Sequence, residues 1–210
     1  MMSHQLGPRR RSLLFAVVLT FACVSERHVA AQKVTINSET STYDFHPTSS
    51  TTSSGSTWYA WHGYADGRDR IFARRQDVDG GLGNTHTLSQ SGVSHGPPTI
   101  VGEYDDSVSV VWSRKNDEQW QVVHRCYVDG SWTQPVVVSD PSHDAIYATA
   151  VTLPGDSTAV AWSAMVDGSW RVRCRQIKAE RLLPIQNVSE ESTDAFRPEL
   201  VRHNDDVWTF

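Results

Sequence analysis

The chain has 210 residues, of which 39% are hydrophobic and 20% are charged, and its formal net charge is −5. Positive and negative residues are interspersed, so the composition fits neither a disordered tail nor a basic arm that binds nucleic acid. Eight Trp, six Tyr and six Phe supply the apolar area of a folded core, because each buried aromatic ring removes a large surface from water.

The first residues of the chain have the pattern of a secretory signal peptide. Three arginines at 9–11 precede an apolar run at 12–24, and small residues follow up to Ala31. This order of segments predicts cleavage after Ala31. The apolar run is too short for a membrane span, which needs about 20 residues. We therefore expect a secreted or periplasmic protein without a membrane span, and the consecutive arginines leave twin-arginine export open as an alternative route.

Loss of residues 1–31 makes the chain more acidic. This segment holds 4 of the 19 basic residues and 1 of the 24 acidic ones, so 15 basic and 23 acidic residues remain, a net charge of −8. Such a charge disfavours nucleic acid and anionic membrane surfaces as partners. Residues 32–43 follow, and their Ser- and Thr-rich composition predicts a linker.

From residue 44 onward the sequence repeats with a period of about fifty residues. Three Trp at the ends of short apolar stretches share this spacing, as do three Arg that lie thirteen residues beyond them, and several Asp. These residues are Trp61, Trp112 and Trp162; Arg74, Arg125 and Arg175; and Asp44, Asp144 and Asp194. A period of this size indicates a solenoid, a propeller or an array of repeated units.

Within each period the apolar residues alternate with polar ones, which predicts strands and not helices. Four short strands joined by tight turns in about fifty residues are typical of one blade of a β-propeller. A β-sandwich is the alternative, but sandwiches rarely repeat their loops as well as their strands. We therefore predict an all-β propeller of four-stranded blades. The predicted blades span about 44–93, 94–143 and 144–193, with an interrupted fourth at 194–210.

Three blades and part of a fourth are fewer than the four to eight of a closed propeller. The sequence therefore predicts either a truncated product or a ring that another chain completes. An interrupted blade exposes an unpaired strand edge, through which the chain can associate with itself.

Residues 132–163 read WTQPVVVSDPSHDAIYATAVTLPGDSTAVAWS. This segment resembles exported bacterial propellers of the sialidase-like and TolB-like type, which carry BNR-like repeats, and more loosely the fungal fucose-binding lectin propellers. The resemblance implies a blade-by-blade fold and a ligand face at the loops. The Asp box of sialidases, S-x-D-x-G-x-x-W, is not matched, so no catalytic residue is carried over.

The loop that leads into the first strand of each predicted blade carries the candidate ligand-binding residues, because propellers usually bind ligands on this face. The candidates are Asp44, His46, Asp144, Asp194 and Arg197. Asp and His side chains can bind a metal ion. An Asp in a turn can instead accept hydrogen bonds from backbone N–H groups of its own turn, and we predict neither a metal nor a cofactor.

The recurring arginines Arg74, Arg125 and Arg175 have two interpretations. Guanidinium groups bind carboxylates in a bidentate fork, so a ring of arginines could hold an acidic ligand. Alternatively, each Arg stacks on a Trp of its own blade or pairs with an Asp of a turn. A residue that recurs in every blade usually serves the blade, and we assign these arginines and the recurring Trp to blade structure.

The expected function is binding of a carbohydrate or a protein partner through the loop face, without catalysis. The alternative is the N-terminal fragment of a sialidase-like or other glycan-processing enzyme that lacks its catalytic blades, and a third hypothesis is an inert truncated product. Adjacent carboxylates at 105–106 and 205–206 lie on repeated turns, and their separation is too small for the acid–base pair of a glycosidase.

Overall fold

Every helix or strand that the structure describes is a β-strand, and the strands pair into four antiparallel sheets. The structure is a computed structural model that describes residues 34–37, 42–90, 92–102, 106–179, 181–192, 194–204 and 206–210. The predicted signal peptide and residues 32, 33 and 38–41 of the predicted linker lie outside these ranges. Residues 35–210 form one compact unit. The described part of the chain contains no helix that could span a membrane.

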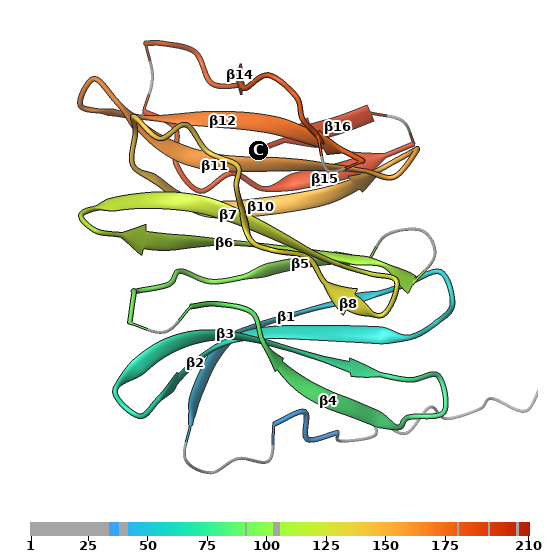
Figure 1. Ribbon diagram of the computed structural model, residues 1–210. Helices are drawn as coiled ribbons and strands as arrows, with labels where there is room; N and C mark the ends of the chain where they lie inside the picture. The colour runs from blue at the N-terminus through green and yellow to red at the C-terminus, as the bar shows by residue number, and fades with distance from the viewer. Residues whose placement is uncertain are drawn as a thin grey trace, which may run out of the picture. The chain divides into compact units, whose positions relative to one another are not determined.

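The four sheets follow one another along the chain (Figure 1). The first contains β1 (Tyr43–Thr51), β2 (Thr57–Ala65), β3 (Arg68–Gln76) and β4 (Leu82–Thr87). The second contains β5 (Thr99–Gly102), β6 (Val108–Asn116), β7 (Gln119–Val128), β8 (Ser131–Trp132) and β9 (Val136–Val137). The third contains β10 (Ala145–Leu153), β11 (Ser157–Val166), β12 (Ser169–Lys178), β13 (Arg181–Leu182) and β14 (Gln186–Asn187). The fourth contains β15 (Leu200–His203) and β16 (Asp206–Thr209). The predicted all-β fold of repeated, roughly four-stranded units is confirmed.

Asp-Gly pairs close several of the hairpins. Asp66 and Gly67, between β2 and β3, have φ angles of 52° and 74°, and Asp167 and Gly168, between β11 and β12, have φ angles of 49° and 81°. Positive φ at both central residues is typical of the type I′ turn, whose twist matches that of the flanking strands. The turn residues that the sequence places between the strands therefore also set the twist of each sheet.

The outer strand is continuous in the first sheet but divided in the second and third. β8 and β9 both pair with β7, and β13 and β14 both pair with β12. Pro135 and Pro184 lie in the two interruptions. Proline has no N–H group to donate to a strand ladder, so it ends the pairing locally.

A serine hydroxyl extends the outer edge of each complete sheet. Each hydroxyl accepts a hydrogen bond from a backbone N–H of the third strand. The three bonds run from Ile71 N to Ser89 Oγ at 2.9 Å, from Val122 N to Ser139 Oγ at 3.0 Å and from Val172 N to Ser189 Oγ at 3.0 Å. The serines recur every fifty residues and hold the outer segment to the sheet where strand pairing ends.

The apolar core lies between successive sheets. Trp58 and Ile71 of the first sheet pack with Val110 and Trp112 of the second. Val111 belongs to a separate cluster that the second sheet forms with the third, which includes Trp162. The alternation of strand side chains thus buries both faces of the second sheet. Trp61, Trp112 and Trp162 are all buried.

The recurring arginines join each sheet to the segment before it. Each one donates from Nη1 to a backbone carbonyl that lies 37 or 38 residues earlier in the chain. The bonds are Arg74 to Ile36 at 2.7 Å, Arg125 to Leu88 at 2.9 Å and Arg175 to Val138 at 2.7 Å. Leu88 and Val138 each follow the outer strand of the sheet before the one that carries the arginine. Ile36 of the predicted linker accepts the same bond, so it lies beside the first sheet as Leu88 lies beside the second and Val138 beside the third.

Trp112→Ala is expected to lower the free energy of unfolding by roughly 3–5 kcal/mol, because Trp112 is only 1% exposed and its removal leaves a large cavity between two sheets. Trp208→Ala is the matched control. Trp208 is 55% exposed, so its removal should cost much less. Urea denaturation of both variants measures the two losses, and similar values would contradict the assignment of the core.

A buried polar pair lies within the second sheet. Ser109 Oγ and His124 Nε2 are 2.7 Å apart, and both residues are buried. Burial lowers the pKa of His124 to about 4, from an ordinary value of 6.5. The imidazole is therefore neutral at pH 7, which removes the cost of placing a charge in the core.

We expect the protein to lose stability between about pH 6.5 and pH 4. In this interval the unfolded chain binds a proton at His124 and the folded chain does not, so acidification lowers the free energy of unfolding, by as much as about 3 kcal/mol at pH 4. Urea denaturation at several pH values measures the slope. The His124→Gln variant does not titrate at this position and should lose less over the same interval, whereas equal losses would exclude His124 as the source.

Candidate functional site

A pocket of about 430 Å³ lies where the first strands of the four sheets begin. Each sheet contributes residues from equivalent positions of the repeat. These are His46 and Thr48 of the first sheet, Pro97 and Thr99 of the second, Tyr147 and Thr149 of the third, and Arg197 and Glu199 of the fourth. The pocket is thus a product of the stacking of the sheets and does not belong to any one of them.

Three of the lining residues have a left-handed backbone conformation. The φ angles of His46, Tyr147 and Arg197 are 53°, 54° and 57°. The pairing of β1 with β2 and of β10 with β11 shifts register at this point, which marks β-bulges. Bulges redirect side chains and are frequent beside functional sites. A left-handed conformation costs a residue with a side chain roughly 1–2 kcal/mol, so the bulge stores strain at the same position of three sheets.

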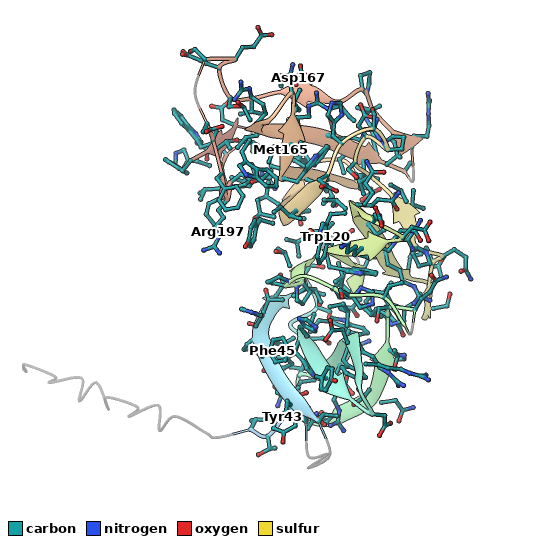
Figure 2. The ribbon with its side chains drawn as sticks, turned by 90° about the vertical axis from the view of Figure 1, so that its left-hand side faces the viewer. Tyr43, Phe45, Trp120, Met165, Asp167 and Arg197 are labelled. Atoms are coloured by element: carbon teal, nitrogen blue, oxygen red, sulfur yellow. The ribbon has the colours of Figure 1, made fainter. Side chains whose placement is uncertain are left out.

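Tyr147 and Arg197 form a stacked pair in the pocket. The guanidinium carbon of Arg197 lies 4.4 Å from the centroid of the Tyr147 ring, and its Nη2 lies 3.1 Å from the Tyr147 hydroxyl, to which it donates. The ring of Phe196 meets Tyr147 edge to face at 4.9 Å. The backbone N–H of Arg197 donates to Ser163 Oγ at 2.9 Å. Figure 2 shows Arg197 at the margin of the sheets, where its side chain projects outward.

The rest of the pocket wall combines threonine hydroxyl groups and a carboxylate with the apolar side chains of Pro97, Ala148 and Pro198. Thr48, Thr99 and Thr149 occupy equivalent places on β1, β5 and β10, and the Thr99 hydroxyl donates to the carbonyl of Ala148 at 3.1 Å. Glu199 adds a negative charge near the positive charge of Arg197. A ligand in this pocket therefore meets an aromatic face, hydroxyl groups and one charge of each sign.

A buried histidine lies next to the pocket on the first sheet. The ring of His62 packs on Phe45 at 4.3 Å, and His62 Nε2 lies 3.4 Å from Asp69 Oδ1. Burial lowers the pKa of His62, Asp69 opposes this shift, and nearby His46 adds to it. His62 is therefore neutral at pH 7, and the fixed positive charge of the pocket is the guanidinium of Arg197.

Two of the five predicted ligand-binding residues, His46 and Arg197, line the pocket, and the three Asp do not. Asp144 Oδ1 accepts a hydrogen bond from the backbone N–H of Trp120 at 2.8 Å, and Asp194 Oδ1 accepts the same bond from Trp170 at 2.9 Å. Each Asp thus reaches the third strand of the preceding sheet and not its own turn.

Asp44 differs from the two aspartates that share its place in the repeat. It lies within β1 and not in a loop before the strand, and its Oδ2 accepts a hydrogen bond from Asn37 Nδ2 at 2.6 Å. The ligand-binding role of the three Asp remains a prediction. The recurring arginines Arg74, Arg125 and Arg175 also lie outside the lining of the pocket.

The sequence did not identify Tyr147, Glu199 or the three threonines as site residues. The position of Tyr147 in the repeat holds His46, Pro97 and Arg197 in the other sheets, so no common residue type marks it. The signal that could have identified the position is the residue after it. A proline follows in three of the four sheets, at Pro47, Pro98 and Pro198, and Ala148 follows in the third sheet.

Among the described residues, no group of three or more His, Cys, Asp or Glu side chains is arranged to hold a metal ion. No protein-family model matches the chain, and no curated protein matches its sequence. The chain is an all-β protein of several small antiparallel sheets, and residues from all four sheets line the pocket described above.

The strain at the bulge position can be measured at His46, which is exposed. Glycine adopts a left-handed conformation without steric cost, whereas alanine does not. We therefore expect His46→Gly to be more stable than His46→Ala by about 1 kcal/mol. Urea denaturation of the two variants tests this difference. If the alanine variant is as stable as the glycine variant, the bulge does not store strain.

Proposed function

We propose that this chain is an exported segment of a β-propeller that binds a carbohydrate, without catalysis, through the pocket at the start of its first strands. The proposal rests on the stacked pair of Tyr147 and Arg197. Both residues have a left-handed backbone conformation, and their side chains meet in the pocket. The repeated sheets and the propeller-like sequence pattern support the fold, and the N-terminal sequence pattern supports export.

The chemistry of the pocket favours a carbohydrate. The C–H faces of a sugar ring pack on an aromatic side chain, and its hydroxyl groups pair with short polar side chains and with charged ones. Tyr147 supplies the aromatic surface, while the threonines, Arg197 and Glu199 supply donors and acceptors. The volume of about 430 Å³ is within the range of small-molecule sites, which supports a sugar over a flat protein surface.

A glycan-processing enzyme is the competing hypothesis. Most glycosidases place two carboxyl groups about the scissile bond. Glu199 is the one carboxylate among the residues that line this pocket in the described part of the chain. One carboxylate beside an arginine suits recognition of a sugar better than its hydrolysis, so we favour binding.

The test is a glycan array probed with the purified mature chain, followed by titration of the glycans that bind. We expect Tyr147→Ala and Arg197→Ala each to weaken binding by at least about tenfold, since 1.4 kcal/mol corresponds to one factor of ten. Arg197→Lys should restore little of the affinity, because an ammonium group lacks the planar surface that stacks on the tyrosine.

Tyr43→Ala is the matched control. Tyr43 is an exposed aromatic residue outside the pocket, so its removal should leave the affinity unchanged. Absence of any glycan above background, or equal loss of affinity in the control, would contradict carbohydrate binding at this pocket. Release of sugar from a bound glycan would favour the enzyme hypothesis.

A further inference from the structure

A second pocket, here called the outer pocket, lies between the second and third sheets at their third and outer strands. Its volume is about 520 Å³, which is within the range of small-molecule sites. The pocket of the proposed function lies at the first strands, which form the opposite edge of each sheet. The second sheet and the segment after it contribute Gln121, Asp140 and Pro141 to the outer pocket, and the third sheet contributes Arg175 and Ile185.

Arg175 is bonded differently from its two counterparts in the repeat. Arg74 Nε donates to the carbonyl of Gly83 at 2.7 Å, and Arg125 Nε donates to the carbonyl of Thr133, each within its own sheet or the segment beside it. Arg175 keeps the bond from Nη1 to the preceding sheet. Its Nε, however, is buried and has no hydrogen-bond partner among the described residues. The repeat thus leaves a donor open at the one of these three arginines that lines the outer pocket.

The second sheet adds an unpaired acceptor to the same pocket. Gln121 Oε1 is buried and also has no hydrogen-bond partner in the described part of the chain. Buried polar atoms without a partner lower the stability of a protein and are uncommon. Gln121 and Arg175 are half-buried and have long side chains, so small rotations can turn these atoms toward a ligand. A ligand that offers both an acceptor and a donor therefore gains two hydrogen bonds that the protein does not make by itself.

The charges in the outer pocket favour a neutral ligand. An anion attracted by Arg175 would meet the carboxylate of Asp140, which also lines the pocket. A cation would offer no acceptor to Arg175 Nε. Asp140 lies 3.6 Å from Arg173 Nη1 and 3.7 Å from His143 Nδ1, so its negative charge already has partners.

The outer pocket also has apolar surface. Ile185 packs against the core cluster between the second and third sheets, and Pro141 is exposed beside it in the lining. One water molecule could pair with the open donor and acceptor, but it fills only about 30 Å³ and gains nothing from apolar side chains. The pocket therefore suits a small neutral group that combines a donor, an acceptor and an apolar end.

We propose that the outer pocket binds the acetamido group of an N-acetylated sugar. The carbonyl oxygen of this group accepts from Arg175 Nε, its N–H donates to Gln121 Oε1, and its methyl group packs on Ile185 and Pro141. Hydroxyl groups of the sugar ring donate to the carboxylate of Asp140. This site is separate from the pocket of the proposed function and does not depend on binding there.

The experiment is saturation-transfer difference NMR of the mature chain with N-acetylglucosamine, followed by titration. We expect the acetyl methyl protons to receive more saturation than the ring protons. Glucose lacks the acetamido group and should bind about tenfold more weakly, because two hydrogen bonds worth about threefold each are lost. The Tyr147→Ala chain should bind N-acetylglucosamine with the same contacts, since the first pocket takes no part.

Gln121→Leu should weaken binding of N-acetylglucosamine by about threefold to tenfold, because it removes the acceptor of the acetamido N–H. Gln134→Leu is the matched control, since Gln134 is exposed and lies outside the lining. It should bind as the wild-type chain does. Circular dichroism checks that each variant is folded, and Pro141→Asp, which places a charge beside the methyl group, replaces Gln121→Leu if the latter is not.

A further probe separates a sugar from an acetylated peptide. Nε-acetyl-lysine carries the same acetamido group on an apolar chain without hydroxyl groups, so it should bind more weakly than N-acetylglucosamine. Equal or tighter binding would overturn the assignment to a sugar. The inference also fails if N-acetylglucosamine does not bind, if its methyl protons are not preferred, if Tyr147→Ala abolishes binding, or if Gln121→Leu and Gln134→Leu have the same affinity.

Discussion

The fold depends on the fact that both faces of a sheet in this chain are apolar. Val110 and Val111 are neighbours on β6, point to opposite faces of the sheet and are both fully buried, one in each of the two core clusters. A sheet with two apolar faces requires a neighbour on each side, because the burial of apolar surface is the main favourable contribution to the free energy of folding. Polar bonds such as Arg125 to Leu88 and Asp144 to Trp120 then fix how the neighbours align, since each has a defined geometry that apolar packing lacks.

The close approach of the first strands connects this stacking to the pocket. A Cβ atom on Gly102 would lie 2.8 Å from the carbonyl oxygen of Thr51, so only glycine permits the observed distance between β1 and β5. The Thr152 hydroxyl donates to the carbonyl of Gly102 at 2.6 Å and ties β10 to the same place. Because these strands run side by side, their first residues lie together, and the bulges in β1 and β10 direct His46 and Tyr147 into the space between them.

The strands and their repeat could be predicted from the sequence, because alternation and the fifty-residue spacing are local and repeated signals. The partners of the recurring polar residues could not. Arg175 and Asp194 recur visibly, yet they bond to Val138 and Trp170, which lie 37 and 24 residues earlier and belong to another sheet. From the sequence we expected each of these side chains to bond within its own blade, whereas in the structure their hydrogen bonds join neighbouring sheets. Tyr147 escaped notice for a different reason, since its position is defined by a left-handed φ and a register shift, which no residue type encodes.

Equivalent positions in this repeat therefore fall into three kinds. Where the residue type is constant, as at Trp112 and Trp162, packing against a neighbouring sheet requires it, and replacement would affect folding. Where the backbone conformation is constant but the residue type varies, as at His46, Tyr147 and Arg197, the fold requires only the bulge and leaves the side chain available for recognition. A third kind of position keeps its residue type and changes its exposure, as Pro47 does relative to Pro98. Pro98 lies between two sheets, whereas Pro47 lies on the first sheet beside the segment that contains Ile36, so the exposure of a residue in this repeat depends on its neighbour and not on its type.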